Sequence, residues 1–139
     1  MSDVHSNETR HYNMSQIRGK DTKPEIIVRK YLFSRGLRYR KHDRRYPGCP
    51  DIVLPKYRVV ILVHGCFWHI HEGCPCFVMP KTRLEFWENK FKQNKRRDIQ
   101  NIEKLKSLGW RVIVIWECEL KKYSRNERLE RLYGEVTLL

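Results

Sequence analysis

The stretch "YRVVILVHGCFWHIHEGCPCF", residues 57–77, joins a strand pattern to a loop rich in metal-binding side chains. Its first part, Tyr57 to Val63, is β-branched and apolar on both faces, which is typical of a strand at the centre of a sheet. Three histidines and three cysteines follow it, interleaved with large aromatic residues. The stretch therefore predicts a central strand that leads directly into a loop with a chemical role.

The segments on either side of this stretch alternate between helix and strand patterns. "DTKPEIIVRKYLFSRG" predicts a helix, with Thr22 as N-cap, Pro24 in the first turn, Glu25 completing a capping box and Gly36 at the end. The other expected elements are strands over Leu37 to His42, Asp51 to Leu54 and Trp110 to Trp116, and helices from Arg83 or Leu84 to Leu108 and from Asn126 to Tyr133. This order predicts an α/β fold with helices flanking a small mixed sheet.

The length of 139 residues suits one compact domain. The apolar runs at 59–63 and 112–116 are far too short to cross a bilayer. The N-terminus is polar and shows no hydrophobic signal region, so we expect a cytoplasmic protein. Residues 1–20 show no core periodicity, so we interpret them as a flexible arm that precedes a domain over residues 21–139.

The formal net charge of +13 favours a polyanionic partner. The basic excess lies in residues 1–45 and in the body of the chain, whereas residues 117–139 are balanced in charge. Nucleic acid is the expected partner, and the alternative is a basic protein without one. A membrane surface is disfavoured because no segment pairs a basic face with a broad apolar face.

The cysteines and histidines of the loop favour zinc. Five cysteines in a reducing compartment are not expected to form disulfides. Zinc takes about four nitrogen or sulfur ligands, and the candidates are Cys66, His69, His71, Cys74 and Cys76, joined by Cys118 after the last strand. The spacing does not select among them, and the alternative is that the cysteines pack in the core and the histidines are solvated. A closed site leaves at least one histidine free for acid–base chemistry.

Asp51 stands where a strand enters the core, although aspartate is unfavourable there. The neighbouring strand of its hairpin ends near Val63 and His64, so Asp51 should lie close to the start of the loop. A carboxylate in that place either binds Mg²⁺ or caps the preceding Pro-Gly-Cys-Pro bend.

Asp98 stands on the apolar stripe of the long helix, seven residues after Phe91 and four before Ile102. A charge on that face must be paired or bound to something. Its partner is either one of the neighbouring residues 95–97 or a functional group outside the helix. Glu25 needs no functional role, because the capping box accounts for it.

The aromatic residues Phe67 and Trp68 follow directly after a candidate metal ligand. They either pack beneath the loop or stay exposed on it, where rigid aromatics stack on bases or wedge between base pairs. Trp87 falls on the apolar stripe of the long helix, where core packing is the default interpretation.

Several motifs together resemble one family. They are "NMSQIRGKDTKPE", "PGCPDIV", "HGCFWHIH", "KTRLEFWENK", "NKRRD" and "LGWRVIVIWECEL", spread over about residues 8–122. The set is similar to the very-short-patch repair (Vsr) endonucleases, which nick DNA at T:G mismatches. The resemblance implies a single α/β domain related to the restriction-endonuclease, PD-(D/E)XK-like, fold with a structural zinc site.

The resemblance also implies the catalytic residues. The "PD" aspartate, which ligates a catalytic Mg²⁺ in the family, corresponds to Asp51, and a backbone carbonyl ligand corresponds to Val63. The two histidines that serve the cleaved phosphate correspond to His64 and His69. A helix glutamate and the "RD" aspartate, which support the metal and its water, correspond to Glu25 and Asp98. A role for Glu25 beyond capping therefore comes from the resemblance alone.

The structural zinc ligands that the resemblance implies are Cys66, His71, Cys74 and Cys118. "HEGCPC" is one residue longer here than is usual in the family, and aligning the following "PKTRLEFW" selects Cys74 over Cys76. The intercalating aromatics correspond to Phe67, Trp68 and Trp87, and the N-terminal arm would insert Met14 and Ile17 from the minor groove.

The implied activity is Mg²⁺-dependent nicking of one strand 5′ to the mispaired T of a T:G mismatch that arises from 5-methylcytosine deamination. The implied partner is duplex DNA with that mismatch, with a functional link to mismatch-repair proteins and a cytosine-5 DNA methyltransferase. We expect a monomer in the bacterial cytoplasm that acts on the nucleoid. Two alternatives are a nuclease of another specificity on the same fold, and a zinc-stabilised DNA-binding module without chemistry. The inward Asp98 disfavours the second.

Overall fold

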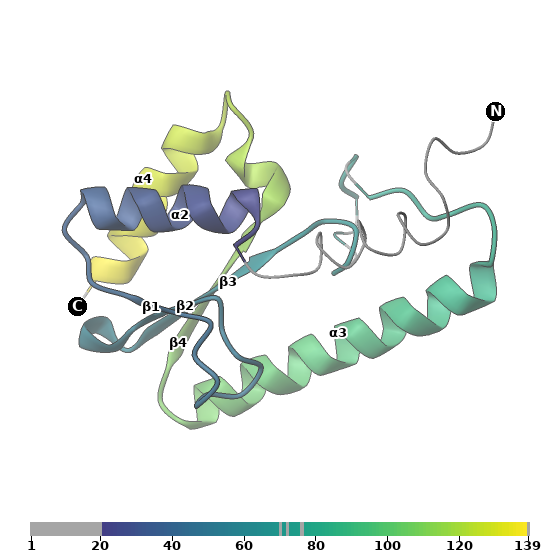
Figure 1. Ribbon diagram of the computed structural model, residues 1–139, viewed down its shortest axis with the longest axis horizontal. Helices are drawn as coiled ribbons and strands as arrows, with labels where there is room; N and C mark the ends of the chain where they lie inside the picture. The colour runs from purple at the N-terminus through teal and green to yellow at the C-terminus, as the bar shows by residue number, and fades with distance from the viewer. Residues whose placement is uncertain (1–20, 70, 72, 76, 139) are drawn as a thin grey trace.

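The computed structural model describes residues 21–69, 71, 73–75 and 77–138 (Figure 1). The expected arm over residues 1–20, with Met14 and Ile17, lies outside the described residues, as does Cys76. None of the helices formed by the described residues combines the length and the apolar character needed to cross a membrane.

A mixed four-stranded sheet forms the centre of the molecule. Its strands are β1 (Arg40–Lys41), β2 (Ile52–Leu54), β3 (Val59–His64) and β4 (Arg111–Trp116), in the spatial order β1-β2-β3-β4. The first three strands are antiparallel neighbours, whereas β3 and β4 run parallel. The predictions of a mixed sheet and of an interior position for the 59–63 segment are therefore confirmed.

Two strand boundaries differ from the sequence expectation. The strand expected from Tyr57 begins at Val59, because Pro55–Tyr57 forms a 3₁₀ turn and Arg58 takes a left-handed conformation with φ +53°. The strand expected over 37–42 is reduced to Arg40–Lys41. Local strand propensity does not indicate how many residues of a segment form hydrogen bonds with an adjacent strand.

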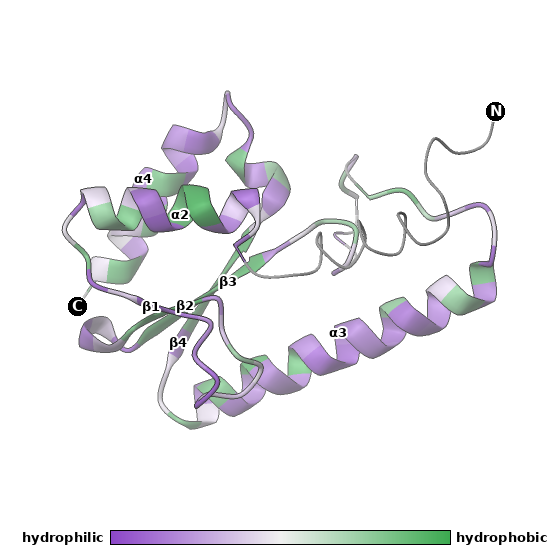
Figure 2. Ribbon diagram, viewed as in Figure 1, coloured by the Kyte–Doolittle hydropathy of each residue, from purple (hydrophilic) through white to green (hydrophobic). Residues whose placement is uncertain are grey.

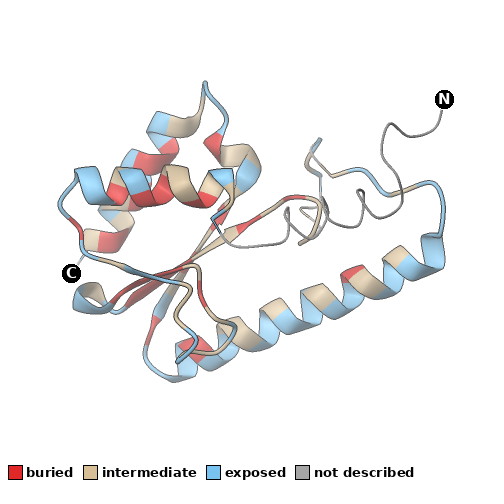
Figure 3. Cartoon of the chain, in the orientation of Figure 1, coloured by how far each residue is buried: buried red, intermediate tan, exposed pale blue. Residues whose placement is uncertain are grey.

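Helices α2 (Lys23–Ser34) and α4 (Arg125–Thr137) cover one face of the sheet. The buried residues of the core on this face are Val28, Leu32, Leu37, Ile52, Leu54, Val59, Ile61, Ile113, Ile115, Leu120, Leu129, Leu132 and Val136. Figure 3 shows buried residues on the strands and on the inner sides of both helices. This apolar layer supplies most of the hydrophobic stabilisation of the fold.

Helix α3 (Leu84–Ser107) crosses the opposite face and extends beyond the sheet (Figure 1). It is largely hydrophilic (Figure 2), and its buried residues are Phe91 and Leu105. Leu105 packs with Val53, Val60 and Trp110 in a second, smaller core. The N-terminal half of α3 lies past this core, where it faces the loop that follows β3.

The expected capping box of α2 does not form. Thr22 is at the N-cap, but its side chain makes no capping hydrogen bond. The Glu25 carboxylate instead accepts a hydrogen bond from the Asp21 backbone N–H, at 3.1 Å. The prediction of a Thr22–Glu25 capping box was therefore wrong. The Glu25 carboxylate also contacts Arg29 and His42.

Candidate active site

The candidate site lies where the two parallel strands end. His64 is the last residue of β3 and lies beside Trp116, the last residue of β4. Asp51 directly precedes β2 and approaches the same end of β3. Because strands hold their backbone rigidly, residues at these ends are fixed relative to one another.

The Asp51 side chain is bound to the backbone of β3. Its Oδ2 accepts a hydrogen bond from the Val63 N–H at 2.8 Å. The N–H and C=O of a strand residue point toward the same neighbouring strand, so the Val63 carbonyl faces the end of β2. Continuing the β2–β3 register places Pro50 opposite Val63, and proline has no N–H to donate. The Asp51 carboxylate and the Val63 carbonyl thus form a pair of oxygens that suits Mg²⁺.

The Asp51 carboxyl is held in a setting that opposes its charge. Burial raises its pKa to about 6, against the hydrogen bond from Val63, and the nearby Glu25 carboxylate adds to the increase. A metal ion reverses this effect, because its positive charge favours the ionised carboxylate. The residues present therefore fit a divalent cation.

Glu25 approaches Asp51 from α2, and His42 connects the two. The Glu25 Oε2 lies 2.8 Å from the His42 Nε2 and 3.4 Å from the Arg29 Nη1. The backbone N–H of His42 donates to the Asp51 carbonyl at 3.1 Å. Since Glu25 is almost fully buried, these partners fix the direction in which its carboxylate can act.

His64 and His69 form a stacked pair beside Asp98. Their ring centroids are 3.8 Å apart and the planes differ by 3°. His69 Nδ1 lies 2.5 Å from Asp98 Oδ2, and the three residues form a tight group. Asp98 thus faces inward as its position on the helix indicated, and its carboxylate contacts a histidine of the loop.

His64, the buried histidine of the pair, carries little positive charge. Burial, with a smaller repulsion from His69, lowers the pKa of His64 to about 4. His64 is therefore neutral at physiological pH, where one ring nitrogen can accept a hydrogen bond. His69 has the Asp98 carboxylate beside its Nδ1, which fixes the orientation of the ring.

Four of the six candidate ligands gather behind this pair. The side chains of Cys66, His71, Cys74 and Cys118 bring their ligand atoms within 4.8 Å of one another. His71 Nδ1 lies 3.6 Å from Cys66 Sγ and 3.3 Å from Cys118 Sγ. Zinc in a tetrahedral site separates nitrogen and sulfur ligands by about 3.5 Å. The donors and their spacing therefore fit zinc, with Nδ1 as the His71 ligand atom.

The surroundings of this Cys/His cluster also fit a cation. Burial raises the pKa of the Cys66 thiol, and a bound metal ion stabilises the thiolate instead. The His71 ring stacks on Trp116 at a centroid distance of 4.1 Å, which fixes its orientation. His69, by contrast, faces Asp98 and stays outside this cluster.

An aromatic cluster connects the loop to α3. Phe67 contacts Trp68 at 5.0 Å, Trp87 at 5.4 Å and Phe91 at 5.3 Å between ring centroids. Phe91 is buried, while Phe67, Trp68 and Trp87 are half-buried. Trp87 thus lies on the inward stripe of α3, but it packs against the loop beyond the end of the sheet rather than in the main core.

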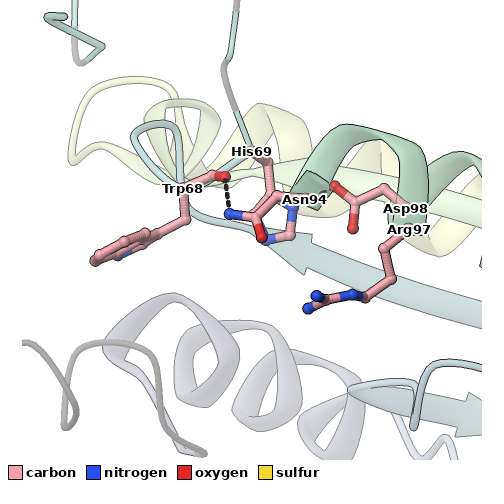
Figure 4. A pocket seen from close by; sticks show the side chains of 5 residues that line it. All are labelled: Trp68, His69, Asn94, Arg97 and Asp98. Atoms are coloured by element: carbon pink, nitrogen blue, oxygen red, sulfur yellow. Dashed lines mark hydrogen bonds and ion pairs between the residues drawn. The ribbon is translucent and has the colours of Figure 1, made fainter. Parts of the chain in front are cut away.

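The sequence reasoning missed four residues of the site. His42 contacts Glu25, and Trp116 contacts His64 and His71. Asn94 and Arg97 line a pocket with Trp68, His69 and Asp98 (Figure 4). Asn94 lies three helical turns before Leu105, so helical spacing places it on the inward stripe of α3. A polar residue on this apolar stripe was a signal in the sequence for a site residue.

Known proteins resemble this chain over most of its length. The family model described as DNA mismatch endonuclease Vsr matches residues 2–76. The chain is 49% identical over 137 residues to the Type II nicking enzyme V.NmeAIP of Neisseria meningitidis, covering 98% of this chain and 97% of that protein. It is 46% identical over 121 residues to the DNA mismatch endonuclease Vsr of Escherichia coli, covering 87% and 77% respectively. A third relative, the Type II nicking enzyme V.XorIIP of Xanthomonas oryzae, is 49% identical over 120 residues, 86% of this chain and 88% of that protein.

The similarity spans the strands, the loop and α3, and therefore every element that carries the candidate site. Asp51, His64 and His69 stand in the motifs that first indicated the family. We conclude that the chain belongs to the Vsr family of DNA mismatch endonucleases.

Proposed function

We propose that this protein is a Mg²⁺-dependent endonuclease that nicks one strand of duplex DNA 5′ to the mispaired T of a T:G mismatch. Such mismatches arise when 5-methylcytosine deaminates, and the nick would initiate very short patch repair. The names of the relatives, mismatch endonuclease and nicking enzymes, support the substrate and the reaction. The observation that carries the proposal is the Asp51–Val63 hydrogen bond beside the stacked histidine pair.

The oxygens of Asp51 and of the Val63 carbonyl would hold the Mg²⁺. A bound Mg²⁺ stabilises the negative charge that builds on the phosphoryl oxygens and favours deprotonation of an attacking water. Arg29 and His42 hold the Glu25 carboxylate in place, and Glu25 would support the metal and its water from this side of the site.

The histidine pair acts on the phosphate. Neutral His64 orients the attacking water or donates a hydrogen bond to the phosphate. With its Nδ1 on the Asp98 carboxylate, His69 presents Nε2 to the leaving oxygen and can transfer a proton to it. Asp98 acts through His69, because its contact with Nδ1 fixes the direction of the ring.

The zinc and the aromatic cluster would serve substrate recognition. Zinc bound by Cys66, His71, Cys74 and Cys118 holds the loop in one conformation, so that Phe67 and Trp68 keep a fixed position relative to His69. Phe67, Trp68 and Trp87 wedge into the base stack. Unstacking costs a few kcal/mol per step and is less costly where pairing is already poor, which favours a mismatch over a paired step.

The direct experiment compares three duplexes of equal flanking sequence that carry T:G, T:A or C:G at one position. We expect a Mg²⁺-dependent nick 5′ to the T of the T:G duplex and at least about 100-fold slower cleavage of the others. Randomised flanks in the same assay report the preferred context. Equal nicking of all three duplexes would identify a nuclease of another specificity, and tight binding without any nick would identify a binding module.

A further inference from the structure

The pocket beside His69 contains an arginine that the proposed mechanism does not use. The pocket encloses about 150 Å³ and is lined by Trp68, His69, Asn94, Arg97 and Asp98. In Figure 4 the Arg97 side chain leaves α3 beside Asp98, and its guanidinium group extends toward the side where His69 and Asn94 lie. Arg97 therefore brings a positive charge to the wall of the pocket next to the proposed catalytic histidine.

The Arg97 guanidinium is not neutralised within the protein. Among the described residues it makes no hydrogen bond or ion pair. The nearest carboxylate along the chain, Asp98, faces Nδ1 of His69 instead. The net charge of +13 further disfavours an internal counter-charge. A pocket with one unmatched cation is suited to an anion.

The shape of the Arg97 guanidinium and the size of the pocket fit a phosphate group. The Asn94 side-chain N–H donates to the Trp68 carbonyl at 3.1 Å, which ties α3 to the loop and fixes the width of the pocket. A planar guanidinium with its forked donors matches the oxygens of a phosphate. At about 150 Å³ the pocket is much larger than the space that one water needs, so a phosphate group fits in it.

We propose that Arg97 binds a backbone phosphate of the nicked strand at the reaction site, and so positions that strand against His69. This proposal rests on the proposed function, because it takes the ligand to be the DNA that is cleaved beside the histidine pair. Arg97 is a binding residue in this account: its guanidinium holds the strand, while Asp51 and the histidines act on the scissile bond.

Arg96 provides a matched control. It precedes Arg97 on the same helix, is exposed as Arg97 is, and carries the same charge. A turn of about 100° per residue directs it away from the His69 pocket, and it lines a separate surface hollow with Lys92, Ile99 and Gln100. Arg96→Ala therefore reports the loss of one positive charge from α3 without loss of the proposed contact.

The test measures the affinity for a T:G duplex without Mg²⁺ over a range of salt concentrations. Each phosphate contact contributes about 0.9 to the slope of log affinity against log salt. We expect Arg97→Ala to bind about 10-fold more weakly and to lower the slope by about 0.9. Arg96→Ala should leave the slope nearly unchanged, and Arg97→Lys should keep the slope while losing part of the affinity.

A second arm replaces single phosphates with neutral methylphosphonates at the scissile position and at its two neighbours. At one of these positions the replacement should weaken DNA binding by the wild-type protein. It should leave DNA binding by Arg97→Ala unchanged, because that variant has already lost the contact. Equal salt slopes for the Arg96 and Arg97 variants, with equal losses on every modified duplex, would overturn the proposal. Failure of the wild-type protein to nick in Mg²⁺ overturns the proposed function instead, and the binding comparison requires no cleavage.

Discussion

The two faces of the central sheet are built for different purposes. Helices α2 and α4 cover one face with an apolar core, whereas α3 touches the other face mainly through Leu105 and then extends past the sheet. There its partners are His69 and the aromatic residues of the loop after β3. The first face stabilises the sheet, and the second face carries the residues of the candidate active site. This division explains how a chain of 139 residues combines one core with a polar site.

The largest expected effect follows from removing a ligand of the Cys/His cluster. We predict that Cys118→Ser lowers the zinc content of the purified protein to near zero and destabilises the loop, because structural zinc contributes several kcal/mol of folding free energy. Bound metal is measured by elemental analysis, and loop opening by limited proteolysis between residues 65 and 77.

Cys49→Ser is the matched control, because Cys49 lies outside the cluster. It should keep its zinc and its resistance to protease. Full zinc content in Cys118→Ser would remove this residue from the ligand set.

A core substitution on the opposite face should affect stability without affecting chemistry. Leu132 is fully buried between α4 and the sheet. We predict that Leu132→Ala lowers the free energy of unfolding by about 2–5 kcal/mol, measured by urea denaturation. Exposed Leu108→Ala should cost less than about 0.5 kcal/mol. Nicking by folded Leu132→Ala at low temperature should match the wild type, and a large loss there would contradict the division between the faces.

The pH dependence of stability tests the Asp51 end of the site. The pKa of Asp51 is raised from 3.8 to about 6, so the folded protein retains a proton that the unfolded chain has released between those pH values. Its contribution to stability therefore falls as pH rises through this window. The pKa of His64 is lowered from 6.5 to about 4, so its contribution falls as pH drops through the same region.

Asp51→Asn removes the first contribution and keeps an acceptor for the Val63 N–H. Without Mg²⁺, we predict that its free energy of unfolding rises relative to wild type by up to about 3 kcal/mol between pH 4 and pH 7. Urea denaturation at several pH values measures the difference. A difference that is constant across this range would show that the carboxyl is not buried as described.

The smallest expected effect concerns His42, which acts through Glu25. We predict that His42→Ala slows nicking about 10-fold and raises the Mg²⁺ concentration for half-maximal rate, as loss of an outer-shell partner does. His42→Gln should recover most of the rate, because its amide N–H can donate to Glu25. Equal rates for both variants and the wild type would exclude a positioning role.

Much of the fold and part of the site follow from the sequence. The apolar run 59–63 predicted the interior strand, and the helical period that placed Asp98 beside Phe91 predicted its inward direction. The gathering of Cys66, His71, Cys74 and Cys118 agrees with the ligand set that the family resemblance implied. Zinc itself, and the roles of these residues, stay predictions.

Other features depended on contacts that no local pattern contains. Instead of a capping box, the Glu25 carboxylate has the Asp21 N–H, Arg29 and His42 as partners. Of these, His42 lies 17 residues away along the chain. Arg97 appeared as one charge in the run 95–97, and only the packing of α3 against Trp68 and His69 separates it from Arg96. Tertiary contacts of this kind decide which member of a charged run faces a site.

The most direct test of the account compares wild type and Asp51→Asn for nicking, DNA binding and stability on one T:G duplex with Mg²⁺. For Asp51→Asn we predict nicking slower by a factor on the order of 10³, with the affinity for the duplex within a few-fold of wild type and no loss of unfolding free energy at pH 7. Nicking by Asp51→Asn at the wild-type rate would contradict the assignment of the chemistry to this end of the sheet.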